Sequence, residues 1–389
     1  MAAWAELPLA RKFEAPAGVQ PPDLAVVMVD GGRLQLRDPP GGTPADERQG
    51  QPRGAGSSPQ GSLNEETPPQ GQPGQPAGEA DWAEEPPSKG SHWHEDKIGL
   101  LLAMHSRVHD SDPCPEIPPG FLDATRIPKL VRELGKSLSP SEDAVGEAKD
   151  PQAEEEAVKE EPQYQPPGVL QRQLVATARP WRAFAPIAAS AAYLRGLQGA
   201  KRKAFVADGS ANNWVLQRRH FGSFVPVLDF IHALSYVFAG AMAGRPFPEG
   251  WARYRGWVGW LWQGQVGRVI EALEQRRRQV GLPREDDGET SVRQVVARAL
   301  GYLSNHRGKM KYDEYRRQGL PITSSLMESA VKQINERVKG TEKFWSEGGG
   351  EALLQLRADA LGDEGQMEAF WQRRQAAATG QRRYRRRAG

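Results

Sequence analysis

The chain is predicted to adopt an α/β fold, and three features of its 389 residues support this prediction. Two apolar runs, VVMVDGG and AFVADGS, have the character of strands and lead into Asp-Gly pairs at Asp30 and Asp208. A third apolar run, FVPVLDF at 224–230, is typical of another buried strand. Helical periodicity dominates much of the rest, including most of 231–317. Strands interspersed with helices are typical of the α/β class.

The first structured segment is predicted to be a β-hairpin at 24–37. The run LAVVMVD is followed by Gly-Gly and then by the alternating run RLQLR, and Asp-Gly between apolar runs is a strong hairpin signal. Structure is predicted to resume near Trp93. By periodicity alone, the stretch EDKIGLLLAMHSRVH at 95–109 fits either a helix or a short buried strand. A helix is expected near 122–135.

In the second half of the chain, the predicted elements follow one another closely. An Ala-rich helix at 181–199 precedes the strand that ends at Asp208, and a short helix at 214–219 follows it. Further helices are predicted at 326–338, 350–361 and 366–374. Four tryptophans gather in the helical region, and their expected role is packing between helices, although aromatic rings can also stack on unpaired bases; they are Trp251, Trp257, Trp260 and Trp262.

Two acidic segments separate these elements. Residues 39–90 contain 11 Pro and 10 Gly and carry a net charge of −5, and residues 137–162 carry −7. Such segments cannot bury enough apolar surface to offset their ordering entropy, so both are predicted to be disordered. The formal charge of +2 therefore leaves +14 on the other 311 residues. A basic body of this kind points to nucleic acid as a partner.

The composition also limits which cellular compartment and which kinds of zinc site are expected. The single cysteine, Cys114, excludes an intramolecular disulfide, and no cysteine cluster is present to hold structural zinc. No signal-peptide core and no run of about 18 apolar residues occurs, so a cytoplasmic protein without membrane contact is expected. A histidine zinc site is not expected either, since His105 and His109 would lie about 13 Å apart on a strand.

Three carboxylates are the strongest candidates for chemistry. Asp30 and Asp208 follow apolar strands, where open α/β sheets place their sites, although each taken alone also fits a turn aspartate. Glu328 lies in the first turns of a predicted basic helix. Taken alone, it fits a helix-start carboxylate that the macrodipole favours.

An ordered set of motifs indicates that these three carboxylates belong to one site. The set resembles the DDE transposases of bacterial insertion sequences, in the branch related to Mutator-like elements, over residues 20–374 apart from the two acidic segments. The motifs are VDGGR, EDKIG, DPCPEIP, ADGSANNW, LDFIHA, LPITSSLMESAVKQINERVKGTEKFW and EALLQLRA. In that family, an Asp on the first strand, an Asp on the fourth strand and a Glu on a later helix of a ribonuclease-H-like core bind two divalent metals. By motif position these are Asp30, Asp208 and Glu328.

The resemblance implies a mixed sheet flanked by helices, with the segment at 95–109 as its third strand. It also implies DNA cleavage and strand transfer with two Mg²⁺ or Mn²⁺ ions per active site. Phosphodiester transfer moves negative charge onto the attacking and leaving oxygens, and two such ions about 3.5–4 Å apart can stabilise both. Mg²⁺ usually takes only one or two protein carboxylates. The implied partner is double-stranded DNA, both element ends and target, bound by a homo-oligomer in the cytoplasm at the nucleoid.

Further residues receive supporting roles from the resemblance. The 119 positions between Asp208 and Glu328 are too many for a simple loop, and the resemblance makes 231–319 a helical insertion. Asp229 and His232 match a family signature of Cys or Asp followed, after two residues, by His. They are expected either to order the site or the DNA, or to form a satisfied core pair.

The basic helix after Glu328 is expected to contact DNA phosphates, the alternative being a solvated helix face. Its candidate residues are Lys332, Arg337, Lys339 and Lys343, beside Trp345. One departure from the family is Thr323-Ser324-Ser325, where relatives often have a Gly-Ser-Gly-like turn that permits positive φ.

Two other functions fit the same residues: a catalytically inactive, transposase-derived DNA-binding protein, and a ribonuclease-H-like nuclease that cleaves without joining ends.

In the preferred interpretation, one catalytic core is interrupted several times. The predicted division is 1–38 start of the core, 39–92 disordered insert, 93–136 core, 137–166 acidic linker, 167–230 core, 231–319 helical insertion, 320–374 C-terminal core helices and 375–389 basic tail.

Overall fold

The computed structural model describes most of the predicted core. The described residues are 6–7, 11–12, 14–37, 82, 93–138, 165–340, 343–363 and 365–377. The predicted disordered insert, acidic linker and basic tail lie almost entirely outside these residues. Among the described helices, none combines the length and the apolar character needed to cross a membrane.

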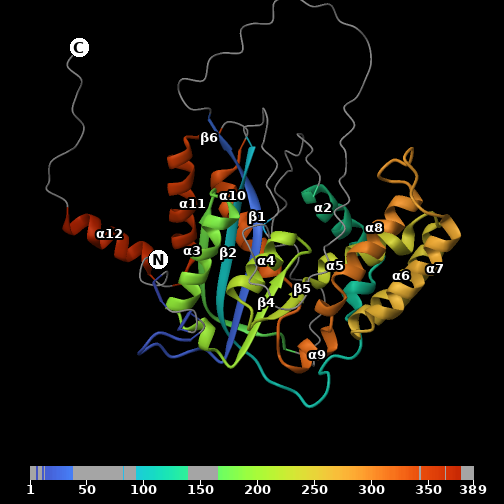
Figure 1. The fold of residues 1–389 in the computed structure, drawn as a ribbon, viewed down its shortest axis with the longest axis horizontal. Helices are drawn as coiled ribbons and strands as arrows, with labels where there is room; N and C mark the ends of the chain where they lie inside the picture. The colour runs from blue at the N-terminus through green and yellow to red at the C-terminus, as the bar shows by residue number, and fades with distance from the viewer. Residues whose placement is uncertain are drawn as a thin grey trace, which may run out of the picture.

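A mixed sheet forms the centre of the molecule (Figure 1). The strand order is β3-β2-β1-β4-β5, in which β1–β2 and β2–β3 are antiparallel and β1–β4 and β4–β5 are parallel. A short strand, β6, pairs with the end of β1. The strands are β1 (Leu24–Leu36), β2 (Trp93–His105), β3 (Gly168–Thr177), β4 (Arg202–Ala207), β5 (Val225–Leu228) and β6 (Phe344–Trp345).

Helices cover both faces of this sheet. Phe184 of α3 lies against Gly99 of β2 on one face, whereas Asn335 of α10 lies against Gly32 of β1 on the other. The predicted α/β architecture, a mixed sheet flanked by helices, is therefore confirmed. The helices are α2 (Arg126–Leu138), α3 (Trp181–Leu194), α4 (Ala211–His220), α5 (Phe230–Met242), α6 (Phe247–Trp262), α7 (Val266–Val280), α8 (Val292–Asn305), α9 (Tyr312–Arg317), α10 (Ser325–Val338), α11 (Glu347–Leu361) and α12 (Gln366–Ala376).

The first strand corrects the predicted hairpin at 24–37, which is wrong. β1 runs without a turn, and each of its residues from Leu24 to Gln35 has a register partner on β2. The Asp-Gly signal fails because the long partner strand continues the ladder past it. Gly32 stays extended, and a Cβ atom there would lie 2.6 Å from Asp96 Oδ1 and 2.9 Å from Asn335 Oδ1. This glycine therefore permits a close approach rather than a turn.

The other predicted elements are mostly confirmed. Residues 95–109 belong to a strand rather than a helix for most of their length, but this strand is the second in the chain and not the third, because β1 is not a hairpin. The helix expected near 122–135 is α2, and the elements predicted after residue 181 occur close to their expected places. β3 was not predicted. It lies at the edge of the sheet, and its polar residues interrupt the apolar pattern.

The segment between β5 and α10 is helical, as expected, and contains α5 to α9 (Figure 1). The tryptophans of α6 belong to its core: Trp257 and Trp262 are buried, and Trp251 and Trp260 pack against buried residues. Trp262 Nε1 also donates a hydrogen bond to the Cys114 carbonyl (2.8 Å), which joins the helical segment to the loop after β2. Core packing is therefore the role that the structure gives to this cluster.

Candidate active site

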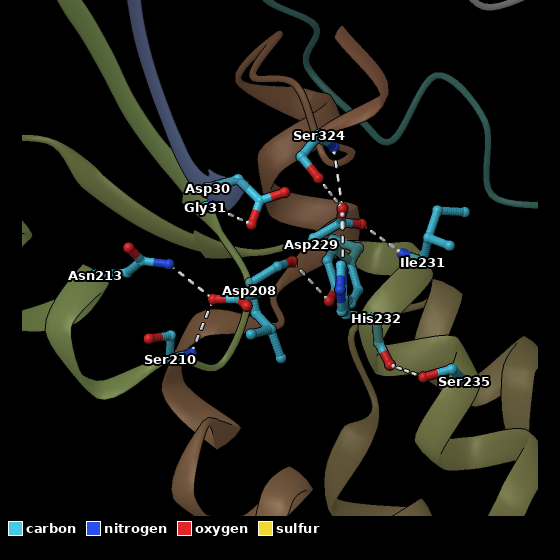
Figure 2. Close-up of polar contacts among 12 residues, drawn as sticks. Asp30, Gly31, Asp208, Ser210, Asn213, Asp229, Ile231, His232, Ser235 and Ser324 are labelled. Carbon is cyan, nitrogen blue, oxygen red and sulfur yellow. Dashed lines mark hydrogen bonds and ion pairs between the residues drawn. The ribbon is translucent and has the colours of Figure 1, made fainter. Parts of the chain in front are cut away.

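Three aspartates occupy matching positions on three neighbouring parallel strands (Figure 2). The last register pair of β1 and β4 is Val29↔Ala207, and Asp30 and Asp208 are the next residues on the two chains. Asp229 follows Leu228, the last register partner of β4 on β5. This edge, at the carboxyl ends of β4 and β5, is where open α/β sheets place their sites.

The carboxyl of Asp30 has a raised pKa. Burial and the negative charge of Asp208 raise the pKa of the Asp30 carboxyl to about 7, and Glu328 adds a smaller increase. The Gly31 N–H, which donates to Asp30 Oδ1 at 2.8 Å, and the charge of His232 oppose this shift. Asp208 and Glu328 therefore both lie within electrostatic reach of Asp30, although the three residues are far apart in the sequence.

Asp208 is held by the turn that follows β4. Its Oδ1 accepts hydrogen bonds from the Asn213 side-chain amide (2.7 Å) and from the Ser210 N–H (2.9 Å) (Figure 2). Gly209 has no room for a side chain, because a Cβ atom there would lie 2.3 Å from Tyr302 Cε2 of α8. The helical segment therefore packs directly against the turn that carries Asp208.

Asp229 connects three parts of the site and is completely buried. It caps α5 by accepting a hydrogen bond from the Ile231 N–H (2.6 Å), and it pairs with His232 Nδ1 at 3.5 Å. It also accepts hydrogen bonds from the Ser324 N–H (3.2 Å) and the Ser324 hydroxyl (Figure 2). Burial opposes its charge, but His232 and these hydrogen bonds outweigh burial and lower the pKa of Asp229.

His232 is the cation of this pair. Burial lowers its pKa, but the Asp229 carboxylate, with smaller contributions from Asp208 and Asp30, raises the pKa of His232 to about 9. The imidazole is therefore protonated at neutral pH and lies among four carboxylates. Asp229, which is fully buried, and His232, which is partly exposed, pair with each other and border the three candidate acids. The expectation that they order the site or the DNA stays a prediction.

Glu328 lies in the first turn of α10 and is partly buried. Burial and the charge of Asp229 raise its pKa, whereas His232 and Lys332 lower it. The Phe230 N–H donates to the Ile322 carbonyl (2.9 Å), so a backbone contact and the Ser324 contacts both tie the start of α10 to the start of α5. Ser324 has a φ of −101°, so the turn before Glu328 does not require a glycine.

The candidate ligands carry carboxylate oxygens, which are the ligands that a hard divalent cation prefers. The three candidate ligands offer only carboxylate oxygens, and their mutual repulsion is visible in the raised pKa of Asp30. A cation would relieve this repulsion and displace the Asp30 proton. Within the described part of the chain, no group of three His, Cys, Asp or Glu side chains could hold a metal ion together. Ligation by one or two carboxylates per ion is the pattern that Mg²⁺ usually shows.

The predicted DNA-binding residues divide into two groups. Lys332, Arg337 and Lys339 are exposed on or directly after α10. Lys343 Nζ instead donates to the Glu336 and Lys339 carbonyls (3.1 and 3.3 Å), and Trp345 Nε1 donates to the Val338 carbonyl (3.0 Å). These two side chains therefore satisfy carbonyl groups at the C-terminal end of α10, which lies about 15 Å along the helix axis from Glu328.

Comparisons of the chain with protein-family models, with curated proteins and with solved structures find no match. The interpretation of the site therefore depends on its own residues. Ser324 and Asn213 bond to two of its aspartates and were not predicted from the sequence. A serine just before a helix suggests a helix cap, but no local signal connects Ser324 with an aspartate 95 residues earlier.

Proposed function

We propose that this chain is the catalytic domain of a DDE-type DNA transposase, which cleaves DNA and transfers strands with two divalent metals. The convergence of Asp30, Asp208 and Glu328 at one edge of the sheet is the observation that carries this proposal. The strand order supports a ribonuclease-H-like core, because the first and fourth strands are neighbours and each contributes one aspartate. Glu328 comes from a later helix, as the resemblance requires.

The proposed roles follow from the positions of the side chains. Asp30, Asp208 and Glu328 would hold Mg²⁺ or Mn²⁺, which would supply the activation of water or a 3′ hydroxyl and the stabilisation of charge on the phosphate oxygens. Protonated His232 partly balances the negative charge of the site when no metal is bound. Asp229 orients His232 and holds Ser324, so it acts as a positioning residue for α10.

The proposed substrate is double-stranded DNA, with element ends and target DNA bound by a homo-oligomer at the nucleoid. Lys332 lies one turn after Glu328, so a duplex whose phosphate reaches the carboxylates would also pass this side chain. Arg337 and Lys339 extend the exposed basic surface toward the C-terminal end of α10. Contacts of this kind give affinity that depends on salt and not on base sequence.

A cleavage and joining assay tests the proposal. The purified chain is incubated with labelled duplexes taken from the DNA on either side of its gene, with Mg²⁺, with Mn²⁺ or with EDTA. We expect metal-dependent nicking and joined products, both lost in Asp30→Asn, Asp208→Asn and Glu328→Gln. Asp110→Asn, an exposed aspartate outside the site, is the matched control. Cleavage without joining would favour the nuclease, and DNA binding without either reaction would favour the inactive DNA-binding protein.

A further inference from the structure

Asp96 is a buried carboxylate that lies outside the three-acid site. It is 0 % exposed, and within the described structure no side chain donates a hydrogen bond to either of its oxygens, although the backbone N–H groups of Gly32 and Asp96 lie close enough to lower its pKa. Buried polar groups are nearly always hydrogen-bonded, so this carboxylate requires an explanation. Its register partner on β1 is Gly32, and both residues lie on the sheet face that α10 covers.

Asn335 of α10 and Asp96 of β2 both approach the space above Gly32. A Cβ atom on Gly32 would lie 2.6 Å from Asp96 Oδ1, 2.9 Å from Asn335 Oδ1 and 3.1 Å from Asn335 Nδ2. Asn335 Oδ1 is also buried without a hydrogen-bond partner. Two buried acceptor groups therefore share the space that the missing side chain of Gly32 leaves open.

A single proton on Asp96 would satisfy both groups. A protonated carboxyl is a donor as well as an acceptor, and an amide oxygen is an acceptor. Burial and the charge of Glu95 raise the pKa of Asp96 to about 6 against the opposing effects of Lys97 and of the Asp96 and Gly32 backbone N–H groups, so the protonated form predominates below about pH 6. A hydrogen bond from the Asp96 carboxyl to Asn335 Oδ1 would then join β2 to α10 beneath the surface.

The Asp96–Asn335 pair and the candidate site both lie between β1 and α10. Glu328 and Asn335 are seven residues apart, which is about two helical turns, so both face the sheet on one side of α10. Asp30 and Gly32 are two residues apart on β1 and face the same side of the sheet. α10 therefore runs along β1 with Glu328 near Asp30 and with Asn335 at Gly32.

We propose that Asp96 and Asn335 form a carboxyl–amide positioning pair that holds α10 against β1 and thereby keeps Glu328 beside Asp30. The role given to Glu328 rests on the proposed function, whereas the contact that fixes α10 does not. The pair is a positioning device, because neither side chain belongs to the three-acid site.

Hydrogen–deuterium exchange of the full chain tests the contact directly. Loss of one partner leaves the other buried and unsatisfied, so we expect the amides of α10 to exchange about tenfold faster in Asn335→Ala and in Asp96→Ala. The double variant should exchange no faster than either single variant, because both remove the same contact. Asp96→Asn should retain protection, since its amide can donate to Asn335 Oδ1 as the carboxyl does.

Gln333→Ala is the matched control, because the Gln333 side chain bonds to Ser329 within α10. It should leave the exchange of α10 unchanged. Additive effects of the two alanine variants, or unchanged α10 exchange in Asn335→Ala, would overturn the proposal. So would an Asp96→Asn variant that loses protection while Mg²⁺ raises it in the wild type, because a cation rather than a proton would then join the two groups.

Mn²⁺ binding, measured by electron paramagnetic resonance, connects the pair with the site. We expect Asn335→Ala to weaken Mn²⁺ binding about tenfold while Gln333→Ala does not, since only the first loosens the helix that carries Glu328. Absence of Mn²⁺ binding in the wild type would contradict the proposed function and leave the exchange experiment to decide the pair. Normal Mn²⁺ binding in Asn335→Ala together with fast exchange would contradict the positioning of Glu328.

Discussion

The buried carboxylate of Asp229 accepts hydrogen bonds from the backbone N–H and from the hydroxyl of Ser324, which lies 95 residues further along the chain. Asp229 begins the first helix of the long helical segment, and Ser324 immediately precedes α10. The helical segment is therefore closed at its two ends by one side chain. Because α10 carries Glu328, this closure determines where the third candidate ligand lies.

Removal of the Ser324 hydroxyl should destabilise the protein. In Ser324→Ala, the Asp229 carboxylate loses a donor in a fully buried environment, so we expect a loss of about 1–3 kcal/mol in the free energy of unfolding. Urea denaturation measures this loss. Ser325→Ala is the control, because Ser325 is the exposed neighbour, and equal stability of the two variants would contradict the role of the Ser324 hydroxyl.

The Asp229–His232 pair predicts a stability that decreases at alkaline pH. The folded pKa of His232 is raised to about 9 from 6.5, so its contribution is fully present below pH 6.5 and is lost as the pH rises through 9. The shift corresponds to a contribution on the order of 3 kcal/mol. Urea denaturation between pH 6 and 10 should show this decrease in the wild type and a flatter dependence in His232→Gln. Parallel curves for the two proteins would refute the assignment.

Asp30 should reduce stability in the absence of metal. Its pKa is raised from 3.8 to about 7, so the folded state holds a proton that the unfolded state releases, and stability decreases as the pH rises from about 4 to 7. Asp30→Asn should therefore be more stable than the wild type at pH 8 in EDTA, by on the order of 4 kcal/mol.

Addition of Mg²⁺ should reverse part of this difference. A ligand that binds only the folded state raises its stability, so Mg²⁺ should raise the melting temperature of the wild type and leave that of Asp30→Asn nearly unchanged. Differential scanning calorimetry with and without Mg²⁺ measures both effects. An equal increase in the two proteins would show that Asp30 does not hold the cation.

Gly32 and Gly31 should respond differently to the same substitution. A Cβ atom on Gly32 would lie 2.6 Å from the buried Asp96 Oδ1, whereas one on Gly31 would meet Glu95 Oε1, the end of a more exposed side chain, at 3.0 Å. We expect Gly32→Ala to cost about 1–3 kcal/mol of unfolding free energy and Gly31→Ala to cost less than about 1 kcal/mol. Chemical denaturation of the two variants compares them, and equal losses would contradict the close packing at Gly32.

The exposed cations of α10 predict a specific salt dependence of DNA binding. If Lys332 and Arg337 each contact one phosphate, alanine at either position should reduce the slope of log K against log salt by about 0.9. Fluorescence anisotropy with a random-sequence duplex measures the slope. Arg278→Ala on α7 removes another exposed positive charge and should leave the slope unchanged. An equal decrease in this control would move the proposed DNA contact away from α10.

Local patterns predicted the parts of the fold that local forces determine. Continuous apolar runs predicted β4 and β5, and helical periodicity predicted α10 and α11 near their observed bounds. The hairpin prediction failed at β1 because the turn preference of Asp-Gly is small compared with the pairing of a whole strand with β2. β3 escaped prediction because an edge strand needs few apolar residues.

The sequence by itself determined which side chains are candidates for chemistry: Asp30, Asp208 and Glu328 were identified from motifs and their order. Only the tertiary structure decided how they are held. The continuous course of β1, the closure of Ser324 on Asp229 and the approach of Asp96 and Asn335 to Gly32 bring together residues that are distant in the chain. Such contacts depend on which elements pack against one another, and the periodicity of an element indicates which of its faces is buried but not which partner covers that face.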